Sequence, residues 1–481
     1  MARMRRSALT ISIVGLLSLF TVLSGAASAA SGHASGGVKG DPQPELKPFK
    51  IGTSNYAGGT AALEPNGTLV VARGITSGSG KIDVCVLARG SSKCSDTVTL
   101  SPLSSDDLFG VPEVFIPSAN HVVVLMDACC DNNPAGSDLL FSSTDGGRTF
   151  SAPVRIGTLG VSAAALVGHD VVFTSGDDNN GAEVESVPVN ASGPPSATAV
   201  ATTATAYDVG VGSYRGGALI ASDYDGTDYT TYVAYAPSGK NFDASGSYHR
   251  VAAINHEQLI AMSGDALLTM RTTGSNALVL RIFNGTTFGP AHVVPGTSGG
   301  GPEWFAVDQD PSGRVHVFSE RAFSPVSYDL YEVSTATGAS WTNPVDLGDA
   351  IQNNTFSAAL DSRGSGLVVG TGADVPAWGY PVLATQGASF SLKHSTITKG
   401  RTTIGSGKGS PAAKGREVEL QIERARLWYT IATTHEGAGG TFSFTIKGTS
   451  AGTYDYRAVV VDVAGYIQYG YSAARSLKVT S

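Results

Sequence analysis

Short alternations of apolar and polar residues, broken by glycine-rich turns, run along most of this chain. The segments "AALEPNGTLVVAR" at 61–73 and "FAVDQDPSGRVHVFSE" at 305–320 each place two apolar runs on either side of a Gly or Asn-Gly turn. Period-two alternation that flanks such a turn predicts a strand, a turn and a second strand. Helical periodicity is almost absent after the first 29 residues, so the pattern predicts an all-β protein.

One segment of the chain, "SSTDGGRTF" at 142–150, recurs as "STATGASWTNPVDLG" at 334–348. Three shorter copies keep only the pattern Gly-x-x-aromatic and end at Phe242, Phe288 and Phe390. Together with Trp341 of the longer copy, these aromatic residues stand 46, 53 and 49 residues apart. A repeat of about 50 residues that holds four short strands is typical of a β-propeller blade. Extending the period along the chain predicts seven blades, with six as the alternative.

The alternation changes character near residue 389, where the strands become longer and turns follow about every ten residues. This spacing favours a β-sandwich. We therefore expect a linker at 30–45, a β-propeller at 46–388 and a sandwich at 389–481. The segment "KPFKIG" at 47–52 resembles the tails "APVRIG" and "NPVDLG" that follow the repeated segment, which predicts that it supplies the outer strand of the last blade and closes the ring.

The first 29 residues have the layout of a secretory signal peptide: "MARMRR", a short apolar run and the small residues "ASA". The apolar run is short for a membrane span, so we expect a secreted, extracellular protein without one. The whole chain has a net charge of −8, which becomes −11 once three arginines leave with the signal peptide. An acidic protein does not suit nucleic acid as a partner. From residue 389 onward, however, 12 Lys and Arg stand against 6 Asp and Glu.

Four cysteines in an exported chain favour disulfides over metal ligands, and no Cys-x-x-Cys spacing for zinc occurs. Cys85 and Cys94 bracket a Gly-Ser turn, and a disulfide across one hairpin is the pairing we expect. Cys129 and Cys130 are adjacent in the sequence. For this pair, a vicinal bridge, pairing with the first two cysteines and free thiols all remain open.

The segment at 142–150 resembles the Asp-box, or BNR repeat, of sialidase-like propellers, whose pattern is S-x-D-x-G-x-x-W/F. The resemblance implies a hairpin turn between the third and fourth strands of a blade, on the face opposite the active site. Ser143, Asp145, Gly147 and Phe150 then have structural roles: Asp145 accepts N–H groups of its own turn, Gly147 supplies an unusual backbone angle and Phe150 packs between strands. The sandwich resembles the Ig-like modules at the C-termini of exported bacterial proteins, in which Tyr454 stands where such folds place a corner tyrosine.

Candidate binding residues come from the loops that the resemblance implies for the opposite face of the propeller. A sialidase needs three arginines, a tyrosine nucleophile with a glutamate and an aspartate acid/base, but the family's Arg-Ile-Pro motif is absent from this chain. We therefore assign no catalytic residue, and solvated loop arginines and aromatic packing between blades remain the alternative reading. The candidates are Arg73, Arg271, Glu303, Trp304, Glu320, Arg321, Tyr328, Trp378 and Tyr380.

The acidic segment "DYDGTDY" at 223–229 offers Asp223, Asp225 and Asp228 as calcium ligands. The alternative is an ordinary Asp-Gly hairpin turn, which explains the same glycine. No cofactor is required by any motif of the sequence, and calcium is the one ion that it suggests.

Two functions are compatible with these features. The first is a secreted non-catalytic propeller that binds a glycan, a cell-wall or other cell-surface polymer, or a protein, and it is the one we favour. The alternative is an exo-acting glycoside hydrolase of the sialidase-like type. The sequence contains no indication of an oligomeric state.

Overall fold

The structure is a computed structural model, and most of the chain from residue 48 onward can be described in it. The described residues are 48–75, 81–88, 91–101, 103, 107–129, 137–157, 161–177, 181–190, 198–200, 208–224, 229–242, 244–274, 276–297, 305–324, 327–349, 355–361, 364–371, 375–382, 387–410, 412, 414–424, 427–462 and 468–481.

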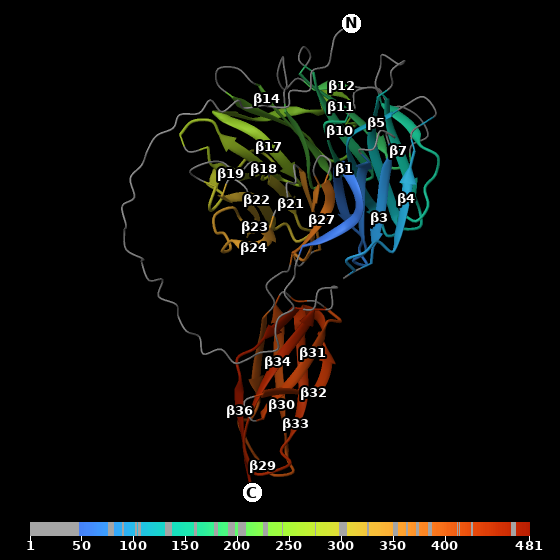
Figure 1. Ribbon diagram of the computed structural model, residues 1–481. Coiled ribbons are helices and arrows are strands. Elements are labelled where there is room, and N and C mark those ends of the chain that lie inside the picture. Colours follow the sequence, from blue (N-terminus) through green and yellow to red (C-terminus); the bar gives the residue numbers. More distant parts are fainter. Residues whose placement is uncertain are drawn as a thin grey trace, which may run out of the picture. The chain divides into compact units, whose positions relative to one another are not determined.

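Antiparallel sheets built from consecutive strands make up the described chain between residues 49 and 382 (Figure 1). There is one seven-stranded sheet, in the order β25-β26-β27-β1-β2-β3-β4, and each of the other five sheets takes four strands. The strands of the seven-stranded sheet are β1 Phe49–Leu63, β2 Leu69–Ile75, β3 Ile82–Leu87, β4 Asp96–Leu100, β25 Thr355–Leu360, β26 Gly366–Thr371 and β27 Val375–Val382. The four-stranded sheets are β5 Asp107–Ser118, β6 His121–Cys129, β7 Ser137–Ser143 and β8 Val154–Gly157; β9 Ala163–Val167, β10 Asp170–Asp177, β11 Gly181–Pro188 and β12 Thr198–Val200; β13 Val209–Tyr214, β14 Gly217–Tyr224, β15 Thr230–Ala236 and β16 His249–Asn255; β17 Glu257–Ser263, β18 Ala266–Arg271, β19 Leu278–Ile282 and β20 His292–Val293; and β21 Phe305–Gln309, β22 Val315–Ser324, β23 Ser327–Thr335 and β24 Val345–Asp349. A short 3-10 turn, Ser245–Ser247, precedes β16.

Burial explains why the second strand of each sheet is a continuous apolar run. In β6, Val122–Met126 are all at most 2% exposed, because neighbouring sheets cover both faces of the strand. One face packs with Val84 of β3 and Phe141 of β7, and the other faces Phe173 of β10. The first strands of successive sheets also contact one another, from β1 and β5 through to β21 and β25. The hydrophobic core is therefore a series of layers between consecutive sheets.

Three hairpins between the first and second strands of a sheet share one turn geometry. In each, a carboxylate residue donates its N–H to a carbonyl four residues ahead and accepts the N–H of a glycine three residues ahead. The glycines have φ between 77° and 87°, a conformation that favours glycine over other residues. The carboxylate and glycine pairs are Glu64 and Gly67, Asp310 and Gly313, and Asp361 and Gly364.

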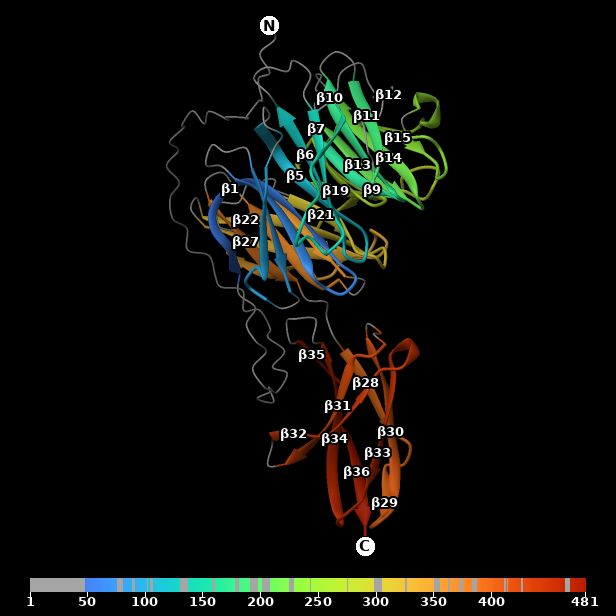
Figure 2. The same ribbon diagram turned by 90° about the vertical axis from the view of Figure 1, so that its right-hand side faces the viewer.

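Strand β1 pairs with β2, which follows it in the sequence, and with β27, which lies far along the chain. Near its start, Phe49 and Lys50 pair with Gly379 and Trp378 of β27, and beyond an irregularity Tyr56–Leu63 pair with β2. Figures 1 and 2 show the blue β1 beside the orange β27, although they stand at opposite ends of this part of the chain. The segment around "KPFKIG" thus pairs with β27, and β1 lies between β27 and β2 in the sheet.

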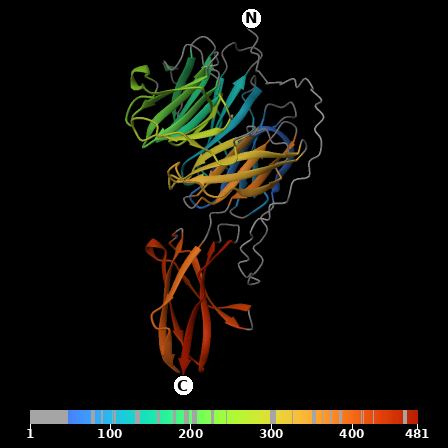
Figure 3. The same cartoon turned by 90° about the vertical axis from the view of Figure 1, so that its left-hand side faces the viewer.

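The C-terminal part consists of two sheets packed around a core of its own (Figure 3). In β33, burial alternates strictly along "TFSFTIK", so Phe442, Phe444 and Ile446 face this core. One sheet has the order β28-β30-β33, and the other has the order β29-β36-β34-β31-β32, with β35 paired to β34. The strands are β28 Gly387–Leu392, β29 Thr396–Thr398, β30 Thr402–Ser410, β31 Glu417–Arg424, β32 Leu427–His435, β33 Thr441–Lys447, β34 Gly452–Asp462, β35 Gln468–Tyr471 and β36 Arg475–Thr480, with a 3-10 turn at Ala438–Gly440.

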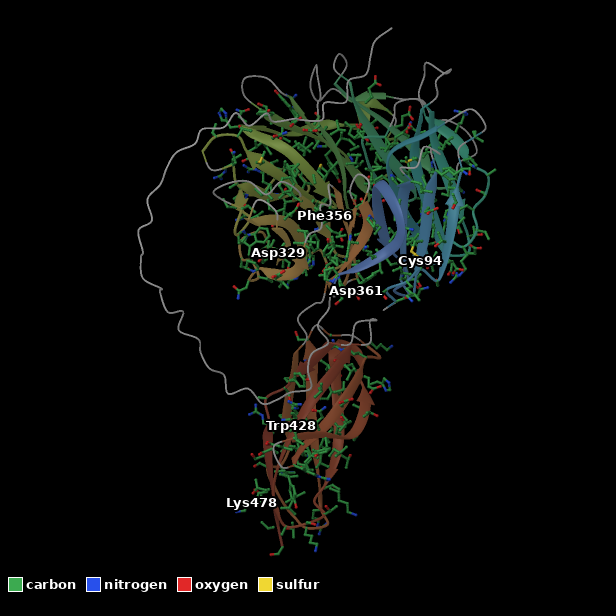
Figure 4. The ribbon with its side chains drawn as sticks, viewed as in Figure 1. Cys94, Asp329, Phe356, Asp361, Trp428 and Lys478 are labelled. Carbon is green, nitrogen blue, oxygen red and sulfur yellow. A yellow bond between two sulfur atoms is a disulfide. The ribbon has the colours of Figure 1, made fainter. Side chains whose placement is uncertain are left out.

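The all-β prediction is confirmed. The predicted disulfide between Cys85 and Cys94 is also confirmed, and it closes the hairpin formed by β3 and β4 (Figure 4). In the part of the chain that the structure describes, no helix has the length and hydrophobicity that crossing a membrane requires. The side chain of Cys129 and the whole of Cys130 lie outside the described residues, as does the predicted signal peptide.

Candidate functional site

Several residues expected on loops are in fact parts of strands. Arg73 lies inside β2 and is 1% exposed, and its guanidinium donates a hydrogen bond to the backbone carbonyl of Ile51 in β1. Glu320 lies inside β22 and is 2% exposed. β2 runs to Ile75 and β22 to Ser324, beyond the points at which the sequence predicted loops to begin, so these two charged side chains belong to the interior of the sheets and not to a solvated loop.

The two aromatic candidates of β27 belong to one apolar cluster. Tyr380 is fully buried, and its ring meets that of Phe356 edge to face at 6.2 Å between centroids. Trp378 packs against the same cluster from a partly buried position, and the ammonium group of Lys50 lies 5.5 Å from the centre of its ring. This cluster also contains Phe318 of β22. The structure therefore brings Trp378 and Tyr380 together as packing between two sheets.

Of the five remaining candidates, the structure describes the side chain of Arg271 alone. Arg271 ends β18, where its backbone is paired with Glu257 of β17. In the ladder of β22 and β23, Arg321 pairs with Asp329 and Tyr328 pairs with Ala322, but the side chains of Arg321 and Tyr328 lie outside the described residues. Glu303 and Trp304 lie outside them entirely.

The turn after β7 is held by the side chains of Ser143 and Asp145. The Ser143 hydroxyl donates to Asp145 Oδ1 at 2.8 Å and accepts the N–H of Gly147 at 2.9 Å. Asp145 Oδ1 also accepts the N–H groups of Arg148 and Thr149, at 3.0 and 2.9 Å, and Oδ2 accepts the Thr149 hydroxyl at 2.7 Å. Hydrogen bonds from the Thr149 hydroxyl and backbone and from Ser143 hold the pKa of Asp145 well below its usual range.

Gly147 and Phe150 complete this turn. Gly147 has φ 81° and is buried against Val70, Val86 and Val122, and Phe150 packs on the cluster that contains Phe141. The hydrogen bonds and apolar contacts of these residues therefore hold the turn together and pack it against the sheets.

The second copy of this segment forms a related turn without the aspartate. The Thr335 hydroxyl accepts the N–H of Gly338 at 2.9 Å and donates to the carbonyl of Ser340 at 2.7 Å. Gly338 has φ 77°, close to the value at Gly147, and Trp341 packs against an apolar cluster as Phe150 does. In each turn, one buried hydroxyl accepts the N–H of the glycine with positive φ: Ser143 for Gly147 and Thr335 for Gly338.

The candidate calcium ligand Asp223 connects two sheets through its carboxylate. Asp223 is 1% exposed in β14, its Oδ1 accepts the N–H of Asp208 at 3.0 Å, and its Oδ2 accepts the N–H of Leu259 in β17 at 3.2 Å. Both oxygens are thus hydrogen-bonded to backbone groups of neighbouring strands. Asp225 and Asp228, on which the calcium hypothesis also depends, lie outside the described residues. Among the described residues, no group of three or more His, Cys, Asp or Glu side chains is arranged to hold a metal ion.

A buried histidine between two carboxylates was not expected from the sequence. His316 of β22 bonds through Nδ1 to Glu332 at 3.0 Å and through Nε2 to Asp310 at 3.3 Å, and all three residues are buried. Burial lowers the pKa of His316, but the hydrogen bonds and charges of Asp310 and Glu332 outweigh it and raise the pKa overall. Because both ring nitrogens are engaged, this cluster stabilises the hairpin of β21 and β22 and offers no free base. The sequence signal was a histidine inside the apolar run "RVHVF".

The apolar surface that the structure leaves exposed is concentrated on strand β32. Leu427, Tyr429 and Ile431 are 51%, 45% and 45% exposed, and β32 is the last strand of its sheet. Among the described residues, no strand pairs with its outer edge. Trp428 belongs to the same strand, and its ring stacks 4.3 Å from the guanidinium of Arg457. Figure 4 marks Trp428 on this part of the chain.

Comparison with known proteins leaves the family of the chain open. No family model matches the sequence, and no curated protein matches it. A protein of unknown function from Dyadobacter fermentans is similar over 69% of this chain and 96% of its own, at 11% identity and a TM-score of 0.39. A tetra-tandem repeat from the extending region of a large adhesion protein is similar over 89% of this chain and 93% of its own, at 12% identity and a TM-score of 0.18. A Salmonella alpha-2-macroglobulin variant covers 92% of this chain with 40% of its own, at 10% identity and a TM-score of 0.18.

Proposed function

We propose that this protein is a secreted, non-catalytic binding protein whose ligand is a glycan, a cell-wall polymer or a protein. It combines a seven-bladed β-propeller with an Ig-like sandwich. The signal-peptide pattern of residues 1–29 supports export, and the disulfide between Cys85 and Cys94 supports an oxidising compartment.

Three features support the propeller. Consecutive groups of four strands follow the 46- to 53-residue repeat of the sequence, and the first strands of successive groups are in contact. The first strand of the last group, β25, also contacts β1. Finally, the start of β1 pairs with β27, so that the last group obtains its fourth strand from the beginning of the chain. A ring of blades needs such a closing strand, because it removes a free sheet edge.

Two features support an Ig-like sandwich. The C-terminal part has two facing sheets with one shared apolar core. The hydroxyl of Tyr454 donates to the carbonyl of Ser450, four residues upstream, at 3.3 Å. This bond is the defining contact of a tyrosine corner in such folds.

The observation that carries the binding function is the exposed apolar row of β32. Leu427, Tyr429 and Ile431 lie on one short strand, whereas scattered single residues are the norm for exposed apolar side chains. By contrast, Arg73 and Glu320, two of the residues that a sialidase-like hydrolase could use, are buried in the sheets. Side chains that are committed to the interior cannot clamp a sugar carboxylate or attack a glycosidic bond.

A glycan array combined with a panel of fluorogenic glycosides tests the proposal. We expect retention of at least one glycan or cell-wall fragment and no release of fluorophore. The double variant Tyr429→Ser, Ile431→Ser should weaken retention, whereas Val345→Ser should not, because Val345 is exposed to a similar extent, 47%, but is the one exposed large apolar side chain of β24. Turnover of any glycoside would favour the hydrolase, and equal retention by all variants would remove β32 from the binding surface.

A further inference from the structure

Three segments of the C-terminal part meet at one end of its sandwich. The N–H of Gly400 donates to the carbonyl of Gly448 at 2.7 Å, and the N–H of Gly448 donates back to the carbonyl of Arg401 at 3.0 Å. The N–H of Lys399 donates to the carbonyl of Thr480 at 2.8 Å. The turn between β29 and β30, the turn between β33 and β34, and the end of β36 are thus tied together.

This end of the sandwich carries five exposed cations, which we call the basic end. The backbone pairing places Lys447 opposite Thr402 and Lys478 opposite Thr396, so their side chains start close to those of the first turn. Figure 4 marks Lys478 on β36. The five residues are Lys393, Lys399, Arg401, Lys447 and Lys478.

No acidic residue occurs in the three segments 393–404, 447–452 and 476–481 that form the basic end. The neighbouring acid is Asp455 of β34, which accepts a hydrogen bond from the Ser476 hydroxyl. Among the ion pairs of the described residues, none involves the five cations. The five like charges therefore repel one another, and a bound ligand of opposite charge would relieve this repulsion.

The basic end also contrasts with the rest of the protein. Residues 389–481 have a net charge of +6 and the signal peptide has +3, so residues 30–388 have −17 of the total of −8. The acidic remainder of the chain repels any long polyanion, so such a ligand would bind through a segment that contacts the basic end.

We propose that the basic end binds an anionic cell-surface polymer through the repeated phosphate or carboxylate groups of that polymer. The inference rests on the proposed binding function and names its ligand class. Arginine and lysine suit both groups, because a guanidinium holds an oxyanion with paired N–H donors and an ammonium acts as a point charge. Such binding weakens steeply as salt is added, because the polymer's counterions are released on binding.

Titration calorimetry of the full chain with linear polyphosphate, polygalacturonate and neutral dextran tests the proposal. We expect binding to one or both anionic polymers, a loss of affinity as salt rises, and no heat with dextran. The double variant Lys399→Gln, Lys447→Gln should lose about tenfold in affinity. The matched control is Lys408→Gln, Lys414→Gln, which removes the same charge from exposed lysines toward the other end of β30.

Polyphosphate binding alone would assign the phosphate source, and polygalacturonate binding alone would assign the carboxylate source. An equal loss of affinity in both double variants would overturn the site, and so would binding that salt does not weaken or tighter binding of a DNA duplex than of either polymer. Thermal unfolding of both variants verifies that they fold. If the array identifies a neutral glycan while both anionic polymers fail, the proposed function stands and this inference does not.

Discussion

The carboxylate of Asp223 accepts the backbone N–H of Leu259 at 3.2 Å, and this bond joins β14 to β17 of the next sheet. With its other oxygen, Asp223 accepts the N–H of Asp208 at 3.0 Å. Replacing Asp223 by Ala removes the acceptor for the N–H groups of Asp208 and Leu259, of which Leu259 is buried. We expect Asp223→Ala to lower the free energy of unfolding by about 1 to 3 kcal/mol, chiefly through the unpaired N–H of Leu259.

Urea denaturation with and without calcium measures this effect. Asp223→Asn retains one acceptor oxygen and should lose less stability. The loss in Asp223→Ala should be the same in both buffers. A loss that appears only when calcium is present would instead return Asp223 to the role of a metal ligand.

The turn after β7 depends on Asp145 in a comparable way. Asp145→Ala removes the acceptor for the N–H groups of Arg148 and Thr149. We expect a lower melting temperature and unchanged ligand binding, because the carboxylate contacts only its own turn. Since the pKa of Asp145 is lowered in the folded state, its contribution is present above the ordinary pKa and is lost as pH falls through the lower folded value. A variant that melts normally but fails to bind would contradict the structural role.

The protein should lose stability as pH rises from mildly acidic to alkaline values. Burial raises the pKa of Glu113 to about 8, and burial raises that of Asp308 to about 6 despite the nearby His316. Groups whose pKa is raised by folding stabilise the folded state below their unfolded pKa, and this contribution is lost as pH rises through the folded pKa. The Asp308 contribution therefore falls between about pH 4 and 6, and the Glu113 contribution between about pH 4.5 and 8.

Urea unfolding at pH 5, 7 and 9 measures this dependence. The uncharged Glu113→Gln variant should flatten the upper part of the profile, because it removes the later of the two titrations. His316 acts in the same direction, since its pKa is also raised. Stability that increases steadily from pH 5 to 9 would contradict the assignment.

The start of β1 should contribute strongly to stability. Ile51 is fully buried in the apolar cluster that contains Val71 and Ala377, and its carbonyl accepts the bond from Arg73. Ile51→Ala should cost about 2 to 5 kcal/mol. The neighbouring Lys50→Ala is the control, because the Lys50 side chain is exposed and contacts only the Trp378 ring. Similar losses in both variants, measured by chemical denaturation, would show that the strand and not the core contact is decisive.

Gly409 of β30 leaves room for a buried ion pair in the C-terminal part. Arg416 donates to Glu436 at 2.6 Å, and both residues are buried. A Cβ at position 409 would overlap the contacting atoms of both side chains. We expect Gly409→Ala to destabilise this part by about 3 to 5 kcal/mol, as for other disrupted buried ion pairs. Gly387→Ala, where a Cβ meets only Ser410 O at 4.0 Å, should be tolerated in the same melting experiment.

The strands were more predictable than the environment of their polar residues. Alternation and Gly turns in "AALEPNGTLVVAR" predicted β1, β2 and their turn, and the spacing of Cys85 and Cys94 predicted their disulfide. Arg73 was assigned to the start of a loop, "RGITSGSG", but β2 continues to Ile75 because Gly74 is paired with Gly58 of β1 and Ile82 of β3. Local sequence carries no information on which distant backbone a side chain reaches, and Arg73 is buried because Ile51 provides its acceptor.

The buried cluster of His316 illustrates the same limit. Its partners Asp310 and Glu332 come from the preceding turn and the following strand, and only the register of β22 with β23 places Glu332 beside the imidazole. Register depends on pairing across the hairpin, which the period-two pattern does not specify to a single residue. For the basic end, the charge excess after residue 389 was visible in the sequence, but its concentration at one end required the pairing of β29 with β36.

The pairing of β1 with both β2 and β27 has a consequence for how the chain acquires its structure. Phe49 finds its partner Gly379 only after 330 further residues have been synthesised, although it belongs to the first strand of the described chain. Contacts of such long sequence separation form late and slowly, because closing the loop costs entropy before any contact repays it. A nascent or truncated chain that stops before β27 therefore presents the start of β1 as an unpaired edge, open to pairing with other chains. Completion of the last strand pair is thus the step at which this part of the protein passes from an association-prone intermediate to its finished state.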